Sequence, residues 1–439
     1  MTTQDQDVHE NVHPGRQQLS LGLAIAITLP GIILRLSGSH ISDPVDALIY
    51  GLSIIGAAFL LSWGAEAAQL DISAGLAIAV LAFIAVLPEY AVDAVFAIKG
   101  GNAFEEFGAI CQSPADIAAG RESPCALALA NMTGANRLLI GLGWTLVVFL
   151  AWYRYRGRGV KMKEVTLERS HSVELAYLSV ATVYSLTLPL KSSITLVDAA
   201  ILISIFIAYT IRVSRAPSEE PHLVGPARWI GGFSVKGRRT TVVAIFVFAA
   251  AVILLCAEHF AEALVETGAT LGISEFFLVQ WLAPFASEAP ELLVAGLYAW
   301  RLNTNAGLGT LVSSKVNQWT LLVGTLPIAF ALASSSTHGL PIIARQREEL
   351  LLTAAQSFFA VVILLNLSMS LREAWILFVL FWTQFILGAV VPAEHHDTEL
   401  VLFSIAYIVM GLFLLAKNRA SVPRLFRDGF KAPYAELKS

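Results

Sequence analysis

The sequence predicts an all-α polytopic membrane protein with about twelve transmembrane helices, which contain two inverted five-helix repeats. The first observation is composition: of 439 residues, 56% are hydrophobic and only 14% are charged, against about 25% charged in a soluble domain. The second is a series of apolar runs far longer than the roughly 10 residues of a barrel strand. The third is a Pro-Glu pair inside two of these runs, at Pro88-Glu89 and Pro290-Glu291.

Twelve runs are expected to form helices, because lipid offers the backbone no hydrogen-bond partners and each run can span about 30 Å of hydrocarbon. The polar residues 1–19 precede the first run and no small-residue cleavage pattern follows it, so we expect an uncleaved first helix. The expected helices cover residues 19–37, 46–68, 74–98, 125–152, 172–190, 193–213, 241–263, 275–301, 306–332, 350–370, 373–393 and 396–417.

Two basic connections predict the orientation of these helices. Lysine and arginine are concentrated in residues 154–169, after the fourth helix, and in residues 212–239, after the sixth. Basic loops stay in the cytoplasm, and the two helices between these loops return the chain to the same side. Both termini are then cytoplasmic, and we expect a multi-pass protein of the plasma (cell) membrane.

The same count divides the chain into five segments. Residues 1–45 form a cytoplasmic N-terminus and an extra first helix, and residues 46–213 form the first repeat. A basic cytoplasmic linker, residues 214–240, leads to the second repeat, residues 241–393. Residues 394–439 supply an extra last helix and a cytoplasmic tail.

The repeats are visible in the residues around the Pro-Glu pairs. Residues 70–89 and residues 271–291 both begin with Leu-x-Ile-Ser and end with Pro-Glu, and they differ by one residue in length. The helices that contain these segments are third and eighth in the count, so they cross the membrane in opposite directions. Inverted repeats with a site near the middle of the bilayer are typical of secondary transporters.

The carboxylates beside the two prolines are the predicted ion-binding groups. A charge at the centre of a transmembrane helix costs about 2.5–3.5 kcal/mol, so we expect Glu89 and Glu291 to face ions, water or partners. Asp93 lies one turn after Glu89, and Glu288 lies one turn before Glu291. The four carboxylates therefore form one expected ion-binding set.

Pro88 and Pro290 are expected to break helical hydrogen bonding, because proline lacks an N–H and frees a carbonyl one turn back. Free carbonyls and carboxylates make the oxygen-rich surroundings that hard cations such as calcium prefer. Glu89 and Glu291 are the expected metal ligands. The alternative is a pair of proline kinks whose acids are neutral or bound to basic residues.

On these residues the sequence resembles the calcium:cation antiporter superfamily, the sodium/calcium and cation/proton exchangers, as a divergent member. Each half of the family carries a Thr-Ser-x-Pro-Glu type motif in one helix and a Gly-Asn-x-x-Gly-Ser-Asn type motif in the next. The resemblance covers about residues 46–150 and 241–335, and it implies that Glu89 and Glu291 are the central ion-binding glutamates. It also implies ion-binding roles for Asn131, Asn136, Ser287 and Ser314.

The departures from the family pattern concern polar ligands. Ala85 and Val86 stand in place of hydroxyl residues of the first motif, and Glu288 stands in place of a serine. Lys315 stands where the motif of the second half would have an asparagine. With two fewer hydroxyl ligands, the coordination of several sodium ions is hard to assemble. Proton-coupled exchange is favoured for a separate reason: a buried lysine beside carboxylates can release a proton when an ion enters.

Lys315 and Arg137 are predicted to compensate the carboxylate charges. Each lies about 10 residues into its helix, near mid-bilayer at about 1.5 Å per residue, and needs an anionic partner there. We expect Lys315, and as a second possibility Arg137, to pair with one of the four carboxylates. Lys315 would then act as a tethered cation in the ion site. The alternative is a permanent structural ion pair that disables transport.

Three weaker features leave alternatives open. Cys111 and Cys125 bracket a polar loop and form either a disulfide, in an oxidising compartment, or two free thiols. The Glu-His-His-Asp group at residues 394–397 either binds a metal or, as we favour, forms a solvated turn. Glu66 and residues 258–262 either line ion entrances or are solvated at the membrane interface.

The sequence thus predicts a secondary active cation antiporter that exchanges calcium or sodium against protons or sodium by alternating access. An enzyme is not expected, because the sequence holds no HExxH and no GxSxG motif. The expected partners are inorganic cations, protons and the lipid bilayer; the net charge of −4 argues against nucleic acid. No cofactor is expected. The alternative is a transport-inactive membrane sensor or scaffold on an exchanger fold.

Overall fold

The computed structural model describes residues 14–71, 87–216, 223, 225–391 and 395–437. In these residues, ten helices are long and apolar enough to cross a membrane. The Pro-Glu helices α4 (Leu87–Phe107) and α12 (Glu275–Trp300) have charged residues in their interiors and complete the expected crossings. The prediction of an all-α polytopic membrane protein is confirmed. The third expected helix, residues 74–98, begins outside the described residues.

The helices of the first half follow the predicted apolar runs. Their bounds are α1 (Pro14–Ser37), α2 (Asp43–Ala68), α4, η1 (Gly108–Ile110), α5 (Pro114–Ala118), α6 (Pro124–Leu138), η2 (Leu139–Trp144), α7 (Thr145–Gly157), η3 (Arg169–His171), α8 (Ser172–Ser185), η4 (Leu188–Leu190) and α9 (Leu196–Val213). The π-helical turn η2 joins α6 and α7 into one crossing of the membrane.

The second half repeats this pattern. Its helices are α10 (Pro226–Gly231), α11 (Val235–Leu271), α12, α13 (Thr304–Asn317), η5 (Gln318–Leu322), α14 (Val323–Ala333), α15 (Ala344–Ile363), η6 (Leu364–Asn366), α16 (Leu371–Val390), α17 (His396–Asn418), η8 (Arg419–Ser421), α18 (Val422–Phe430) and α19 (Tyr434–Leu437). The π-helical turn η5 joins α13 and α14, as η2 joins α6 and α7.

Short strands and capping residues fix where several helices begin. Strand β1 (Glu164–Thr166) pairs antiparallel with β4 (Ser368–Ser370), and β2 (Ser193–Ile194) pairs with β3 (Leu340–Pro341). The last residue of β4, Ser370, opens α16 with a capping box, in which its side chain and that of the third helical residue satisfy two free N–H groups. The strand pairs therefore tie loops of the first half to loops of the second.

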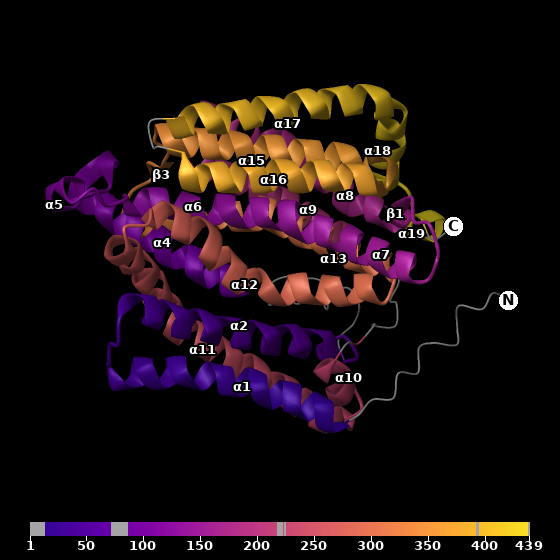
Figure 1. The fold of residues 1–439 in the computed structure, drawn as a ribbon, viewed down its shortest axis with the longest axis horizontal. Helices are drawn as coiled ribbons and strands as arrows, with labels where there is room; N and C mark the ends of the chain where they lie inside the picture. Colours follow the sequence, from indigo (N-terminus) through magenta and orange to yellow (C-terminus); the bar gives the residue numbers. More distant parts are fainter. Residues whose placement is uncertain (1–13, 72–86, 217–222, 224, 392–394, 438–439) are drawn as a thin grey trace.

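All the long helices run roughly side by side, so the molecule has two ends (Figure 1). The α5 end holds α5, the α1–α2 connection and the α11–α12 connection. The α18 end holds α10, α18, α19 and the beginning of α1. We use these two names below for the two sides of the expected membrane.

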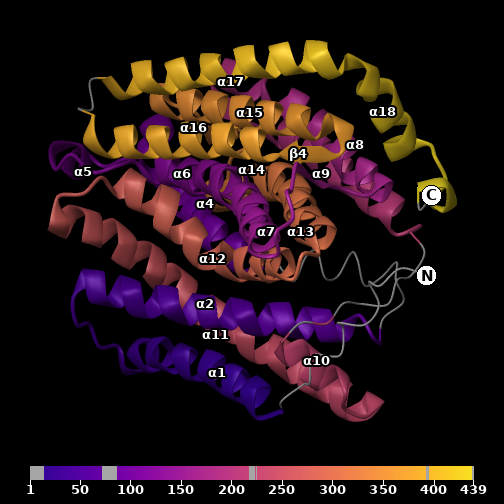
Figure 2. The ribbon, with the colours of Figure 1, turned by 45° about the vertical axis from the view of Figure 1, so that its right-hand side comes forward.

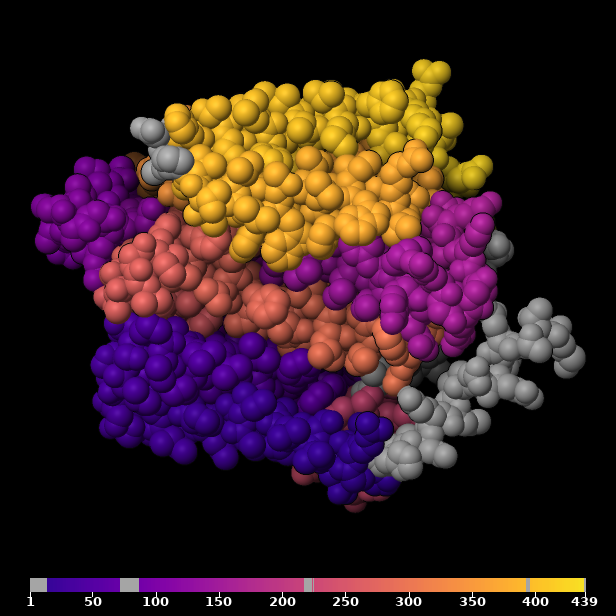
Figure 3. Space-filling model, viewed as in Figure 1, coloured from indigo at the N-terminus to yellow at the C-terminus, as the bar shows by residue number. Residues whose placement is uncertain are grey.

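Helices α1, α2 and α11 form a bundle beside the larger bundle of the remaining long helices (Figures 1 and 2). Figure 3 shows the same division from outside, with α5 projecting at one end. Helices α2 and α11 are antiparallel, and side-chain hydrogen bonds join them at both ends. Thr270 Oγ1 donates to Asp43 Oδ2 at 3.0 Å at the α5 end. Arg238 makes two hydrogen bonds of 2.6 and 2.9 Å to Asp71 at the α18 end.

The two halves cross-pack as inverted repeats would. Helix α4 packs on α14 and on α6, and α12 packs on α6 and on α13. Helix α6 begins at the α5 end, whereas α13 begins at the α18 end, where Arg154 Nε donates to Trp300 O at 3.0 Å. Equivalent helices thus run in opposite directions. The boundaries of the five predicted segments stay predictions.

Candidate functional site

Four carboxyl groups meet between α4 and α12, and we call them the acid cluster: Glu89, Asp93, Glu288 and Glu291. Glu89, Asp93 and Glu288 are at most 3% exposed, and Glu291 is half-buried. Glu89 lies close enough to each of the other three to be repelled electrostatically by them. The structure therefore brings together the four acids that the sequence analysis singled out.

Gln318 links the two halves of the acid cluster. It is the first residue of the π-helical turn η5. Its Nε2 donates to Glu288 Oε1 at 2.6 Å and to Glu89 Oε2 at 3.3 Å. Sequence analysis did not single out this residue. The available signal was its place in the polar run that follows Lys315, and π-helical turns are frequent at functional sites.

Two further predicted residues contact the acid cluster. Asn131 Nδ2 donates to Asp93 Oδ1 at 2.5 Å, and Ser314 Oγ donates to Glu291 Oε2 at 2.5 Å. Each of these bonds joins two helices. Ser287, by contrast, donates to the carbonyls one turn back in its own helix, at 3.2 and 3.3 Å. Its predicted ion-binding role stays a prediction.

The acid cluster and two amide side chains that contact it contain buried oxygen atoms that accept no hydrogen bond. They are Glu89 Oε1, Asp93 Oδ2, Asn131 Oδ1, Glu288 Oε2 and Gln318 Oε1. A buried oxygen without a partner is costly, so these atoms need a proton, a water molecule or a cation. Among the described residues, no three His, Cys, Asp or Glu side chains stand close enough together to hold a metal ion. The metal-ligand roles of Glu89 and Glu291 therefore stay predictions.

Lys315 is fully buried beside the acid cluster and is held by Asn136. Its Nζ donates to the backbone O of Asn136 at 2.7 Å and to Asn136 Oδ1 at 2.6 Å. The ammonium group also lies 4.8 Å from the centre of the Trp319 ring. It makes no ion pair with the acid cluster in the described part of the chain, although Glu288 and Glu89 act on it electrostatically. The expected direct pairing is thus replaced by a tie to Asn136.

Arg137 does not pair with the acid cluster, which corrects the second expected pairing. Its Nη1 lies 2.6 Å from Glu349 Oε2, and its Nη2 donates to Gln384 Oε1. The guanidinium lies 4.9 Å from the centre of the Trp281 ring. The reason is helical geometry: successive residues of a helix point about 100° apart, so Asn136 and Arg137 face different neighbours.

The two prolines have different surroundings in the described chain. Pro290 lies inside α12, one turn after Ala286, whose carbonyl thereby loses its helical donor. Pro88 is the second residue of α4. The turn before it lies outside the described residues, so the expected break of the helix there stays a prediction.

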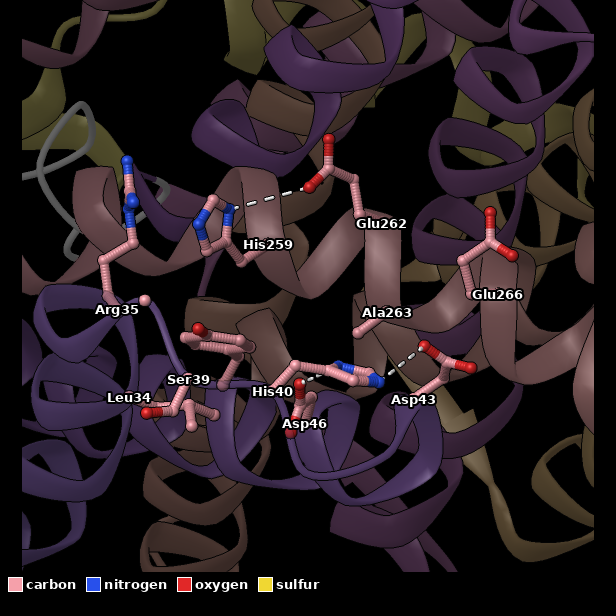
Figure 4. Close-up of a pocket in the computed structure, with 12 residues that line it drawn as sticks. Leu34, Arg35, Ser39, His40, Asp43, Asp46, His259, Glu262, Ala263 and Glu266 are labelled. Carbon is pink, nitrogen blue, oxygen red and sulfur yellow. Dashed lines mark hydrogen bonds and ion pairs between the residues drawn. The ribbon is translucent and has the colours of Figure 1, made fainter.

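A recess of about 280 Å³ opens at the α5 end between α1, α2 and α11 (Figure 4). His259 and Glu262, from the predicted 258–262 segment, lie on one wall and point toward each other. On the other wall His40 Nδ1 is hydrogen-bonded to Asp46 Oδ2 at 2.8 Å. Glu66 is not among the lining residues. Whether this recess is an ion entrance stays a prediction.

The structure decides one of the open alternatives. Cys111 and Cys125 are joined by a disulfide, and Cys256 is a free, buried thiol. The 394–397 group is described only in part, because residue 394 lies outside the described ranges. His396 in that group hydrogen-bonds to the backbone O of Val391 at 2.7 Å.

A cluster of buried acids between inverted halves of a polytopic helical protein defines an integral membrane cation transporter. The profile of the sodium/calcium exchanger protein family matches residues 47–215 and 241–390. The chain belongs to the sodium/calcium exchanger family, whose members are cation antiporters. The resemblance seen in the sequence is confirmed.

Solved structures agree with this family. The crystal structure of an H+/Ca2+ exchanger, CAX, is 38% identical, aligned over 97% of this chain and 99% of its own, with a TM-score of 0.85. Native YfkE and a selenium-substituted Ca2+/H+ antiporter YfkE are each 15% identical over 89% of this chain and 99% of theirs, with TM-scores of 0.54 and 0.56. At that identity they support the fold alone. No curated protein sequence matches this chain significantly.

Proposed function

We propose that this antiporter exchanges calcium for protons by alternating access around the acid cluster. The observation that carries the proposal is the group of buried carboxyl and amide oxygens without hydrogen-bond partners, contributed by both halves of the chain. Carboxylate and amide oxygens are the ligands that calcium prefers, and the same carboxylates bind protons. The cations are cargo, and we propose no resident cofactor.

The charge balance requires a counter-ion, and the similarity to a proton-coupled exchanger favours protons. Four carboxyl groups of the acid cluster face one buried ammonium group, that of Lys315. Several uncompensated negative charges at membrane depth are costly. When the carboxylates release calcium, protons or another cation must therefore neutralise them. The H+/Ca2+ exchanger that is 38% identical over nearly the whole chain supports protons over sodium.

Lys315 completes the proposal as a tethered cation. Its hydrogen bonds occupy both oxygens of Asn136, a residue that the family resemblance assigns to ion binding. The ammonium therefore takes over part of the space and the ligands that a second transported ion would use. Calcium arriving at Glu89 and Glu288 would repel this ammonium, because both act on it electrostatically.

We further propose that both termini are cytoplasmic in the plasma membrane and that the α5 end faces outward. The described residues of the two basic connections, 154–169 and 212–239, belong to the α18 end, in agreement with the positive-inside rule. The recess at the α5 end then faces the outside, with Glu262 paired with Lys99 at 2.8 Å and Glu266 paired with Arg121 at 2.6 Å.

The proposal is tested by ion flux in proteoliposomes. The full chain is reconstituted with a trapped calcium indicator, and uptake is driven by a pH gradient or by a sodium gradient. We expect uptake with the pH gradient, and proton movement that depends on calcium. Uptake driven by sodium alone would make the counter-ion sodium. An absence of any flux, with the protein folded, would favour a sensor or scaffold instead.

A further inference from the structure

A second set of buried polar side chains lies on another face of α6, and we call it the Arg137 network. Each of its members comes from a different helix. They are Arg137 of α6, Gln280 of α12, Glu349 of α15, Gln384 of α16 and Glu399 of α17. All are at most 7% exposed. None belongs to the acid cluster, so the network is a separate polar site at membrane depth.

The centre of the network is a complete ion pair. Arg137 Nη1 lies 2.6 Å from Glu349 Oε2, which also accepts from Gln280 Nε2 at 2.9 Å. The other guanidinium nitrogen, Nη2, donates to Gln384 Oε1. One positive and one negative charge thus cancel, and the hydrogen-bonding groups around them are used. Breaking such a buried pair without a replacement partner leaves an uncompensated charge, so Arg137 can leave Glu349 only for another carboxylate.

Glu399 is the carboxyl group of the Arg137 network that takes no part in this ion pair. It lies in the first turn of α17, is 7% exposed, and its Oε1 accepts no hydrogen bond. It lines a cavity of about 20 Å³ together with Gln280, Glu349 and Gln384. A cavity needs about 10–15 Å³ to hold a water molecule, which also needs polar partners. This cavity meets both conditions.

The charged groups around Glu399 come from three helices. Arg137 faces it from α6. Glu349 faces it from α15, where Arg345 also lines the cavity but is paired with Glu122 at 3.2 Å. His396 of α17 itself also lines the cavity.

The residues that α12 and α16 present here, Gln280 and Gln384, carry no charge. Glu348, the neighbour of Glu349, interacts with Asp397. Among the described residues, the cationic groups near Glu399 are thus Arg137, which is paired with Glu349, Arg345, which is paired with Glu122, and His396 when it is protonated.

We propose that Glu399 is a proton-binding site outside the acid cluster, loaded from the α5 end through this small cavity. Helix α17 begins at the α5 end (Figure 1), and His396 and Arg345, which line the cavity, are half-buried. A proton passes from water to the free Oε1, which turns a carboxylate into a neutral carboxyl. When the proton leaves, the carboxylate of Glu399 competes with that of Glu349 for the Arg137 guanidinium.

Helix α6 connects this site to the acid cluster. Arg137 follows Asn136, whose two oxygens hold Lys315, and Asn131 of the same helix holds Asp93. A shift of Arg137 toward Glu399 therefore pulls on the helix that carries two ligands of the acid cluster. This deepens the proposed function: protons at Glu399 regulate exchange from the α5 side, and only the transport consequence rests on calcium transport being real.

The proton count tests the site without any transport. The detergent-solubilised full chain, free of calcium, is titrated between mildly acidic and neutral pH, and protons bound per molecule are measured. Glu399→Gln should bind one proton fewer than wild type, and Glu399→Asp should restore it. Glu106→Gln, which removes an exposed carboxyl of α4 at the same end, should leave the proton count as in wild type, because Glu106 is not part of the Arg137 network. Equal counts for wild type and Glu399→Gln would overturn the proposal.

A second variant keeps the test usable if Glu399→Gln does not fold. In Glu349→Gln the guanidinium of Arg137 keeps only one anionic neighbour, Glu399, so Glu399 should stay ionised. The proton count should again fall by one. An unchanged count in a folded Glu349→Gln protein would contradict the proposed competition for Arg137.

Transport supplies the third measurement. In proteoliposomes held at a constant pH difference across the membrane, calcium flux of Glu399→Gln should respond less to the pH on the α5 side than that of wild type, whereas Glu106→Gln should respond like wild type. An unaltered pH profile in Glu399→Gln would remove the regulatory role. If wild type moved no calcium while the proton counts behaved as expected, the calcium proposal would fail and the proton site would stand.

Discussion

The ammonium of Lys315 donates to both the backbone oxygen and the side-chain oxygen of Asn136, at 2.7 and 2.6 Å. These residues lie 179 positions apart and come from the two halves of the chain. The bond therefore joins the π-interrupted helix of one repeat to that of the other. It also places a fixed positive charge beside four carboxyl groups, and the first prediction concerns that charge.

Replacing Lys315 should change how tightly the site binds calcium. In Lys315→Asn the ammonium is gone and Asn136 Oδ1 becomes free to ligate an ion, so calcium affinity should rise at least about tenfold, or ~1.4 kcal/mol. Calcium binding should also release fewer protons. Isothermal titration calorimetry in two buffers of different ionisation enthalpy measures both quantities. Lys315→Arg keeps the charge and serves as the control; equal affinities for wild type and Lys315→Asn would end the tethered-cation idea.

The glutamates of the two Pro-Glu pairs should both be needed for transport. Glu89→Gln and Glu291→Gln each remove a buried negative charge while keeping the shape of the side chain. We expect calcium flux to fall at least about 100-fold, since loss of one charged partner in a buried site is worth ~2.7 kcal/mol or more. Flux in proteoliposomes is compared with that of the exposed variant Glu106→Gln. Normal flux in both variants would rule out a site built on two carboxylates.

Gly134 is the position where α6 and α12 approach most tightly. A Cβ at Gly134 would lie 1.7 Å from the backbone oxygen of Gln280, so Gly134→Ala must push the two helices apart. Overpacking of this kind costs about 1–3 kcal/mol, and Tm in detergent should fall. Gly22→Ala on α1 is the matched control, because nothing lies within 4 Å of its Cβ. Alanine there should raise helix stability by about 0.5–1 kcal/mol; equal Tm values for the two variants would contradict the structure.

The ion pair between Asp71 and Arg238, which lies at the α18 end, should make the stability of the protein depend on pH. Hydrogen bonds from Arg238 hold the pKa of Asp71 below its ordinary value. Because the pKa of Asp71 is lower in the folded protein, the ion pair stabilises the fold at a pH above the pKa of an unfolded aspartate, about 3.9. This stabilisation is lost as the pH falls below that value. The Tm difference between wild type and Asp71→Asn should therefore shrink in acid. A difference that stays constant down to strongly acidic pH would show that the ion pair contributes nothing to stability.

The acid cluster could be predicted from the sequence because its members carry a local signal. Glu89 and Glu291 are charges inside apolar runs, and the Leu-x-Ile-Ser to Pro-Glu segments show that the two sites are related. Asp93 and Glu288 follow from helical spacing. Gln318 has no comparable signal, because a single glutamine in a polar run does not show which face of its helix meets the carboxylates.

The partners of the buried cations could not be predicted in the same way. Arg137 and Lys315 each needed an acceptor, and four acids were available nearby in the expected site. The structure gives Arg137 a partner 212 residues away on α15 and gives Lys315 an amide. Such choices depend on which helices pack together and how each is rotated, and one residue along a helix changes the direction by about 100°.

The sequence alone determined that this is a polytopic helical protein with duplicated, oppositely directed halves and acids at membrane depth. These properties follow from hydropathy, run length and the repeat of short motifs, each of which is local along the chain. Only the tertiary structure decided that Arg137 pairs with Glu349 instead of the acid cluster and that Glu399 keeps a buried oxygen without a hydrogen-bond partner. Both outcomes depend on the packing of α6 against α15, α16 and α17, which no local pattern encodes.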